Sequence, residues 1–118
     1  MAARSFNLTL RNVTNLTLHR KNVNLMHGEF SGSGNAVPPE NIAPMTRATW
    51  QSESDGFATG TEGTVTYGSE VGDFFIHWNN PFVGSNGLGV AVPTGFSYVF
   101  GDISGNDANV AITISPNV

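Results

Sequence analysis

Apolar and polar residues alternate along most of this chain with a period of two. The alternating apolar positions gather in short segments separated by Gly, Asn, Ser and Pro, and no window carries the helical period of about 3.6 residues. The segments cover residues 6–10, 16–18, 23–30, 48–50, 65–67, 74–78, 96–100 and 110–114. Alternation of this kind is typical of antiparallel sheets that are packed on one face.

Turn-forming sequences lie between these segments. Short polar links are expected at 12–15 and 20–22, and loops bounded by Gly or Asn at 68–72 and 101–106. One longer segment, 31–44, contains three prolines, which exclude a central strand, and we interpret it as a surface crossover. Short strands with turns every 8 to 12 residues or so predict a β-sandwich or a small barrel.

The length of the chain, 118 residues, is that of one domain. We therefore expect a single all-β domain over residues 1–118, built as an antiparallel β-sandwich of about eight to nine short strands. The sequence has no Cys, which excludes disulfide bonds, thiolate chemistry and metal sites with Cys ligands.

Charge narrows the choice of partner. Charged residues make up 12% of the chain, the net charge is −4, and all five Lys and Arg residues lie in the first 47 positions. Nucleic-acid backbones are bound by clustered cations that displace counterions, and anionic lipids attract similar clusters. We therefore expect no nucleic-acid partner and no attraction to anionic lipid, while neutral sugars and zwitterionic lipids remain open.

Targeting signals are also informative. No apolar signal segment precedes the first strand-like pattern, and no apolar run approaches the ~18 residues that would span a bilayer. We expect synthesis in the cytoplasm without a signal peptide, so that action at an outer membrane would need lysis or unconventional release.

Several residues resemble parts of catalytic sites. The cluster at 52–55, Ser-Glu-Ser-Asp, has no Gly-x-Ser-x-Gly elbow and no His linked to it in sequence, so we interpret it as a polar loop after Trp50. Glu53, Asp55 and Glu62 could supply a glycosidase pair, but so short a chain rarely builds the required cleft. We expect no catalytic residues and no enzymatic activity.

Metal ligands are not indicated either. His19, His27 and His77 do not occur at the short spacings of paired ligands, and His19 and His77 fall on the polar sides of their strands. Asp102 and Asp107 could approach a calcium ion, but turn formation explains these residues equally well. We expect no metal and no other cofactor.

The loop at 78–86 carries the strongest signal for a ligand. Trp78 and Phe82 flank Pro81, and Ser85 and Asn86 follow. Aromatic faces suit a choline-type headgroup or the apolar face of a sugar, and neutral Ser and Asn side chains supply orienting hydrogen bonds.

Trp78 has a second interpretation. It is in register with Phe74 and Ile76 on one strand, so its indole could belong to the core instead of the ligand site. Both alternatives remain open for Trp78, whereas Phe82 lies beyond the proline.

Nearly the whole chain resembles the aegerolysins, small acidic β-sandwich proteins of fungi and bacteria. Residues 75–85 resemble the Trp-x-x-Pro-Trp-Gly-Ser signature of that family, and weaker similarity covers 6–13, 22–30, 59–67, 96–98 and 110–114. The chain is similar more distantly to actinoporins and fungal fruit-body lectins, which share the cytolysin-like fold.

The sequence departs from the aegerolysin pattern at informative positions. Phe82 stands where a second Trp is usual, His27 stands where a Trp precedes Gly28, and Asn80 replaces the Cys of the signature. The tyrosine cluster with which actinoporins bind phosphocholine has no counterpart after Pro81. The resemblance therefore predicts the fold more strongly than it predicts any particular ligand site.

The resemblance implies a membrane-lipid-binding protein that recognises a neutral or zwitterionic, sphingolipid-like headgroup through loops at one end of the sandwich. Some aegerolysins open pores only with a perforin-like protein partner, so this chain could be the binding component of a two-part cytolysin. A lectin on the same fold, forming a homodimer, and a storage protein without a ligand are the alternatives. The ligand contacts that we expect, the last two by family analogy, are Trp78, Pro81, Phe82, Ser85, Asn86, His27 and Phe30.

Overall fold

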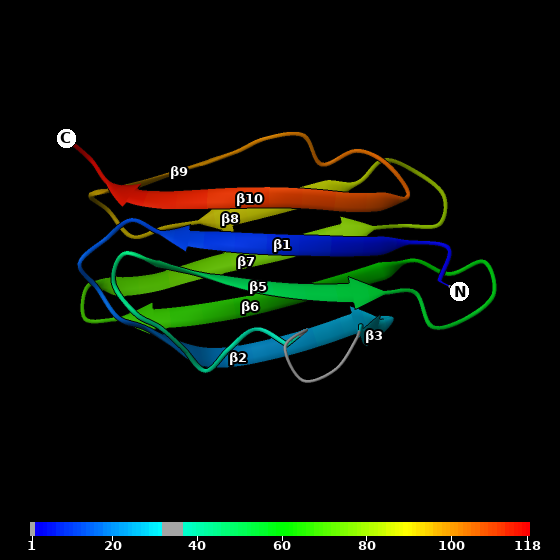
Figure 1. Ribbon diagram of the computed structural model, residues 1–118, viewed down its shortest axis with the longest axis horizontal. Helices are drawn as coiled ribbons and strands as arrows, with labels where there is room; N and C mark the ends of the chain where they lie inside the picture. Colours follow the sequence, from blue (N-terminus) through cyan, green and yellow to red (C-terminus); the bar gives the residue numbers. More distant parts are fainter. Residues whose placement is uncertain (1, 32–36) are drawn as a thin grey trace.

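The computed structural model describes residues 2–31 and 37–118 and has two five-stranded sheets. The first sheet has the order β3 (Glu29–Phe30), β5 (Thr46–Glu53), β1 (Ser5–Asn12), β10 (Asp107–Pro116) and β9 (Phe96–Phe100). The second has the order β4 (Asn41–Ile42), β2 (Leu18–His27), β6 (Thr61–Ser69), β7 (Gly72–Asn80) and β8 (Gly87–Ala91). The two sheets stack as a sandwich (Figure 1), which confirms the expected all-β class. The described residues include no helix that is long and apolar enough to cross a membrane.

Strand pairing follows the expected antiparallel pattern with an exception at the centre of the first sheet. There β1 and β10 run parallel, with Phe6 beside Ala108 and Leu10 beside Ile112. The other pairs of described strands are antiparallel. The first and last long strands of the sequence are thus neighbours, which joins the two ends of the chain into one sheet.

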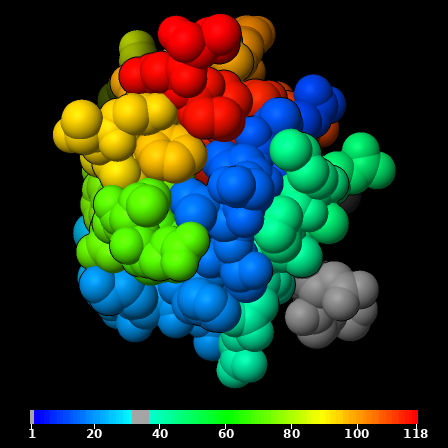
Figure 2. Space-filling model, turned by 90° about the vertical axis from the view of Figure 1, so that its left-hand side faces the viewer, coloured from blue at the N-terminus to red at the C-terminus, as the bar shows by residue number. Residues whose placement is uncertain are grey.

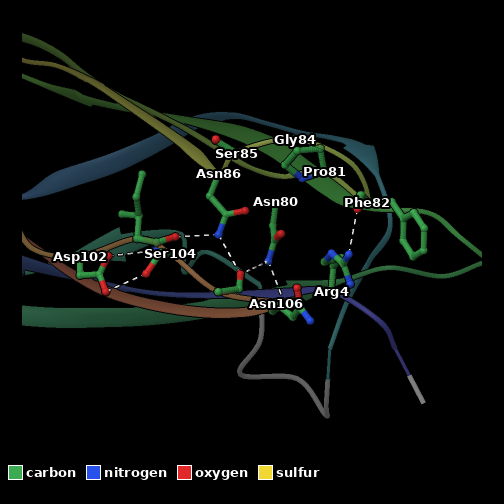
Figure 3. Close-up of a pocket in the computed structure, with 12 residues that line it drawn as sticks. Arg4, Asn80, Pro81, Phe82, Gly84, Ser85, Asn86, Asp102, Ser104 and Asn106 are labelled. Atoms are coloured by element: carbon green, nitrogen blue, oxygen red, sulfur yellow. Dashed lines mark hydrogen bonds between the residues drawn. The ribbon is translucent and has the colours of Figure 1, made fainter.

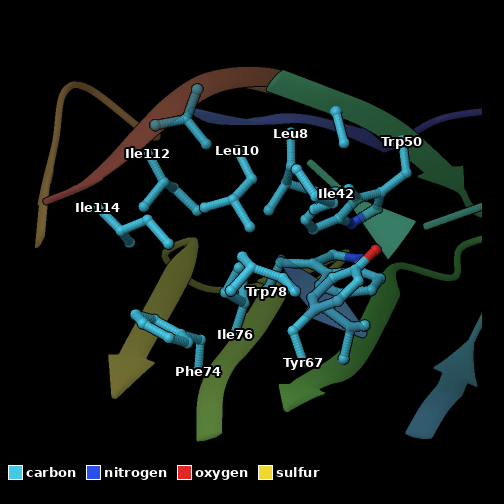
Figure 4. Close-up of a cluster of buried hydrophobic side chains, with 14 of the residues drawn as sticks. Leu8, Leu10, Ile42, Trp50, Tyr67, Phe74, Ile76, Trp78, Ile112 and Ile114 are labelled. Atoms are coloured by element: carbon cyan, nitrogen blue, oxygen red, sulfur yellow. The ribbon is translucent and has the colours of Figure 1, made fainter. Parts of the chain in front are cut away.

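The core lies between the sheets and is built from the alternating apolar positions (Figure 4). The indole rings of Trp50, from the first sheet, and Trp78, from the second, are fully buried with centroids 6.0 Å apart. Burial of a large apolar side chain contributes about 1.5–3 kcal/mol to stability. The other fully buried large side chains are Phe6, Leu8, Leu10, Leu18, Ile42, Tyr67, Phe74, Ile76, Ile112 and Ile114.

Three features of the second sheet were not predicted. The link expected at 20–22 was wrong, because these residues lie inside β2, where a bulge between Arg20 and Asn22 shifts the register and breaks the alternation. Strand β8 was missed because Gly87 and Gly89 weaken its pattern. The short β4 also lies in the expected crossover, of which residues 32–36 are outside the described residues.

Side-chain hydrogen bonds help to fasten the crossover to the second sheet. The Tyr67 hydroxyl donates to the Pro39 carbonyl at 2.6 Å, and Arg20 Nη1 donates to the Pro38 carbonyl at 2.7 Å. Burial raises the pKa of Tyr67 above its ordinary value, against a smaller opposing effect of the Arg20 charge. The phenol therefore stays neutral and keeps this donor at physiological pH.

The molecule is elongated, with extents of 44 × 26 × 18 Å, so its two ends form separate surfaces. The N-terminal segment and the β5–β6, β7–β8 and β9–β10 links gather at one end, on the right in Figure 1. The opposite end, which faces the viewer in Figure 2, carries the β1–β2 link at its centre and the C-terminal segment above it. The first of these ends holds the loop that the sequence singled out.

Candidate ligand-binding end of the sandwich

A cavity of about 300 Å³ opens between the β7–β8 and β9–β10 links (Figure 3). Amides, hydroxyls and one carboxylate line it together with a single cation, Arg4. Its lining comprises Arg4, Asn80, Pro81, Phe82, Gly84, Ser85, Asn86, Asp102, Ile103, Ser104, Gly105 and Asn106. We refer to it as the Arg4 cavity.

Two asparagine amides hold the walls of the Arg4 cavity together. Asn80 is buried at the end of β7, and its Nδ2 donates to the carbonyls of Ser5, Gly105 and Asn106 at 2.9, 3.2 and 2.8 Å. Asn86 Nδ2 donates to the carbonyls of Ile103 and Gly105 at 2.7 and 2.9 Å. Both amides thereby tie the β7–β8 region to the β9–β10 link.

Arg4 is positioned by a buried serine that directly follows β5. Ser54 Oγ accepts hydrogen bonds from the backbone N–H groups of Ala3 and Arg4 at 3.1 and 3.2 Å. Arg4 Nη2 then donates to the Phe82 carbonyl at 2.8 Å, and the guanidinium carbon lies 4.6 Å from the centroid of the Phe82 ring. The stacked guanidinium keeps N–H donors for a ligand anion, since it presents five donors in all.

The β9–β10 link is ordered by its own acidic residue. Asp102 accepts hydrogen bonds from the Ser104 N–H at 3.0 Å and from the Ser104 hydroxyl at 2.9 Å. These bonds, with the backbone bond first, lower the pKa of Asp102 from its ordinary value. Asp102 acts here as a turn residue, as the sequence indicated.

A second cavity, of about 320 Å³, shares Pro81 and Phe82 with the Arg4 cavity. Its carboxylate is Glu62, whose Oε2 lies 2.7 Å from His77 Nε2 and whose Oε1 lies 4.0 Å from His27 Nε2. The lining comprises His27, Thr59, Gly60, Thr61, Glu62, Asn79, Pro81 and Phe82. We refer to it as the Glu62 cavity.

A buried hydrogen-bond chain connects the core to the Glu62 cavity. Trp78 Nε1 donates to Ser52 Oγ at 2.9 Å, and Ser52 Oγ lies 2.6 Å from Thr61 Oγ1. Thr61 Oγ1 donates in turn to the His27 carbonyl at 3.1 Å. Ser52 is thus a structural residue inside β5, so the polar loop expected at 52–55 begins only after Glu53.

Exposed apolar side chains surround these cavities. Phe57 in the β5–β6 link is 100% exposed, and Val83 and Phe82 in the β7–β8 link are 84% and 38% exposed. A third cavity, beside Phe57, is lined by Glu29, Glu53 and Asp55 among other residues. No group of three or more His, Asp or Glu side chains in the described part of the chain could hold a metal ion.

The structure brings together five of the seven expected contact residues. Pro81, Phe82, Ser85 and Asn86 line the Arg4 cavity, and His27 joins Pro81 and Phe82 around the Glu62 cavity.

The other two expected contacts lie elsewhere. Trp78 is fully buried, so the core alternative describes it, and its indole is not available to a ligand. Phe30 packs on Trp78 with ring centroids 6.5 Å apart, on the inner side of the sheets, and lines neither the Arg4 nor the Glu62 cavity. Both rings therefore belong to the packing between the sheets and not to the lining of the site.

Four residues of this end were not predicted. Arg4 and Ser54 lie far from the loop in sequence. The pairing of β1 with β5 brings them beside each other, and the stacking of the two sheets places Arg4 beside Phe82. Asn80 looked like one more loop asparagine, although its place at the Cys of the family signature was a signal for a buried role. The sequence suggested for Glu62 only a role in a glycosidase pair.

No family model matches the chain. The chain is 34% identical over 110 residues to an uncharacterized protein of Dictyostelium discoideum, which covers 92% of this chain and 10% of that protein. The chain thus spans about a tenth of the length of this relative. The structure superposes on the crystal structure of the lipid binding protein Nakanori with a TM-score of 0.78, 16% sequence identity, and coverage of 98% of this chain and 72% of the other. The chain has an aegerolysin-like fold. At this level of identity, the likeness shows the fold alone. The ligand has to be inferred from the chemistry of the site.

Proposed function

We propose that this protein is a non-enzymatic membrane-binding protein that recognises a zwitterionic, sphingolipid-like headgroup with the loops at this end. The observation that carries the proposal is the pair of cavities that share Phe82, one lined by the cation Arg4 and the other by the carboxylate Glu62. A phosphate suits the guanidinium of Arg4. A trimethylammonium group suits the Glu62 carboxylate and the Phe82 ring.

Three further observations support a membrane as the carrier of that headgroup. Phe57 and Val83 project from the same end and can enter the lipid–water boundary. The shared fold with a protein whose name includes lipid binding points in the same direction. Four of the five cations, Arg11, Arg20, Lys21 and Arg47, lie on strands away from these loops, so anionic lipid is not the preferred surface.

The first experiment is co-sedimentation with vesicles of phosphatidylcholine, with and without sphingomyelin and sterol, at low and high salt. We expect binding to sphingomyelin-containing vesicles that survives high salt, because the contacts are short-ranged and few charges can be screened. Binding to none of these vesicles, or binding only to anionic vesicles at low salt, would overturn the proposal.

Phe82→Ala gives the decisive comparison. We expect vesicle binding to weaken by about tenfold, since a ring contact worth about 1–2 kcal/mol is lost. Phe75→Ala is the matched control, because Phe75 is 37% exposed against 38% for Phe82 but lies mid-strand in β7, on the outer face of the second sheet. Equal binding by both variants would remove the loop from the proposal.

Two other variants separate headgroup recognition from anchoring. Glu62→Gln keeps a hydrogen-bonding group beside His77 but removes the charge, and we expect it to weaken binding of soluble phosphocholine. The double variant Phe57→Ser/Val83→Ser should weaken vesicle binding and leave phosphocholine binding unchanged, because these side chains line neither the Arg4 nor the Glu62 cavity. If Glu62→Gln weakened only vesicle binding and the double variant weakened phosphocholine binding, Glu62 would be the anchor, and Phe57 and Val83 would recognise the headgroup.

The resemblance to aegerolysins supports one more part of the proposal, that a perforin-like partner supplies pore formation. Vesicles loaded with a dye should then leak only when both proteins are present. A lectin function is the second candidate, because the amides and the carboxylate of the Arg4 cavity are also groups that bind sugar hydroxyls. Inhibition of cell binding by a free sugar, with no binding to pure lipid vesicles, would favour the lectin.

A further inference from the structure

The outward face of the first sheet carries its charges at opposite ends. Side chains of β5, β1 and β10 form four rows across the strands, and the pairing registers place them in order. From one end to the other the rows are Arg47–Arg11–Thr113, Thr49–Thr9–Ala111, Gln51–Asn7–Asn109 and Glu53–Ser5–Asp107. We refer to these twelve residues as the outer face.

The row Arg47–Arg11–Thr113, which we call the positive row, has unfavourable electrostatics in an isolated molecule. Arg11 and Arg47 are directly opposite each other on neighbouring strands, an arrangement in which like charges repel. Both are exposed, and neither makes a side-chain hydrogen bond or an ion pair within the described residues. The other cations are engaged, since Arg20 lies near Glu40, Lys21 pairs with Asp73, and Arg4 stacks on Phe82.

The middle rows are uncharged and already paired in part. Asn7 Nδ2 donates to Gln51 Oε1 at 2.9 Å, and the hydroxyls of Thr9 and Thr49 lie 3.1 Å apart. These polar groups can be covered without losing those partners. A centre depleted of charge with a charged rim is the usual composition of a protein–protein interface.

We propose that the outer face binds the outer face of a second copy of this chain. The two-fold axis would lie in the interface and run across the strands, so that each copy presents its positive row to the negative row of the other. Arg47 then faces Glu53 of the second copy, and Arg11 faces Ser5 between Glu53 and Asp107 of that copy. A two-fold axis along the strands would instead place Arg on Arg.

The area of the outer face determines how strong this contact can be. Three strands about 4.8 Å apart and four rows about 6.8 Å apart give roughly 400 Å² per copy. A standard stable interface buries about 800 Å² per partner. The dimer is therefore weak, depends on protein concentration, and dissociates as salt screens its charged rims.

The test is sedimentation equilibrium of the full chain over a range of protein and salt concentrations. We expect a monomer–dimer equilibrium at low salt that shifts to monomer at high salt. Arg11→Glu/Arg47→Glu alone and Glu53→Arg/Asp107→Arg alone should each be monomeric, whereas an equimolar mixture of the two should form heterodimers. The fourfold exchange of all these charges keeps the net charge of the wild type, and it should restore the homodimer.

Several outcomes would overturn the inference. The wild type could stay monomeric at low salt up to about 1 mM protein. The dimer could persist in Arg11→Glu/Arg47→Glu, or the fourfold exchange could stay monomeric while its thermal unfolding matches the wild type. Ala111→Arg provides a second route if the charge exchanges fail to fold, because it places one charge in the uncharged middle rows of the outer face. A dimer that tolerates this substitution uses another surface. None of these measurements involves a ligand, so they are independent of the proposed function.

Discussion

At the residue scale, two tryptophans with equal burial differ in one hydrogen bond. Trp78 Nε1 donates to Ser52, whereas Trp50 Nε1 is buried without a partner among the described residues. An unpaired buried donor costs about 1–3 kcal/mol. We expect Trp50→Phe to destabilise the protein less than Trp78→Phe by about that amount in urea unfolding, because only the second substitution removes a satisfied bond. Equal losses would mean that packing alone determines both values.

Asn80 gives a second prediction at this scale. Its amide joins β7 to three backbone carbonyls of the N-terminal strand and the β9–β10 link. Asn80→Ala leaves those carbonyls and a buried site unsatisfied, so we expect a loss of about 1–3 kcal/mol in the free energy of unfolding. Asn79→Ala is the control, because its half-buried side chain makes no hydrogen bond within the described residues. A similar loss in both variants would contradict the structural role of Asn80.

These residues also show how far sequence reasoning reached at this scale. Register with Phe74 and Ile76 favoured a core position for Trp78, since alternation determines the face of a strand on which a side chain lies. Arg4 could not be placed beside Phe82 in this way, because 78 positions separate them in the sequence and only tertiary pairing brings them together. Periodicity predicts faces within a strand but gives no information on which loops meet.

At the element scale, strands with clear alternation were predicted and those interrupted by glycine were not. Strand β7 alternates without interruption, whereas β8 contains Gly87 and Gly89, and its pairing with β7 becomes visible only in the folded sheet. Strand β2 fails at its bulge for a related reason, because an extra residue shifts the apolar period by one. Tertiary pairing overrides weak local preference in both cases.

Two glycines on the strands that flank β7 give a prediction at this scale. A Cβ at Gly63 in β6 would lie 2.5 Å from Trp78 Cζ2, whereas a Cβ at Gly89 in β8 meets only His77 Cβ, at 3.9 Å. We expect Gly63→Ala to cost about 1–3 kcal/mol through overpacking. Gly89→Ala should be neutral or stabilise by up to about 1 kcal/mol, because it restricts the unfolded chain. Thermal unfolding of both variants measures this difference, and a stable Gly63→Ala would mean that the Trp78 ring can move.

At the scale of the whole molecule, the proposed lipid site and the proposed dimer determine a geometry together. The negative row of the outer face lies at the same end as the cavities, since Glu53 and Ser5 adjoin Ser54 and Arg4. An antiparallel dimer therefore directs its two ligand-binding ends away from each other. The molecule is 44 Å long, so each end can approach a different membrane.

This geometry predicts that the dimer brings vesicles together. At low salt and at protein concentrations where the dimer forms, wild-type protein should cluster sphingomyelin vesicles and raise their turbidity. Arg11→Glu/Arg47→Glu should bind the same vesicles without clustering them, because the substitutions lie at the end opposite the cavities. If both dimerisation and vesicle binding are measured but clustering is absent, the two-fold axis has the other orientation. If vesicle binding itself fails while the dimer persists, the lipid proposal is the part that is wrong, and the outer face keeps its assignment.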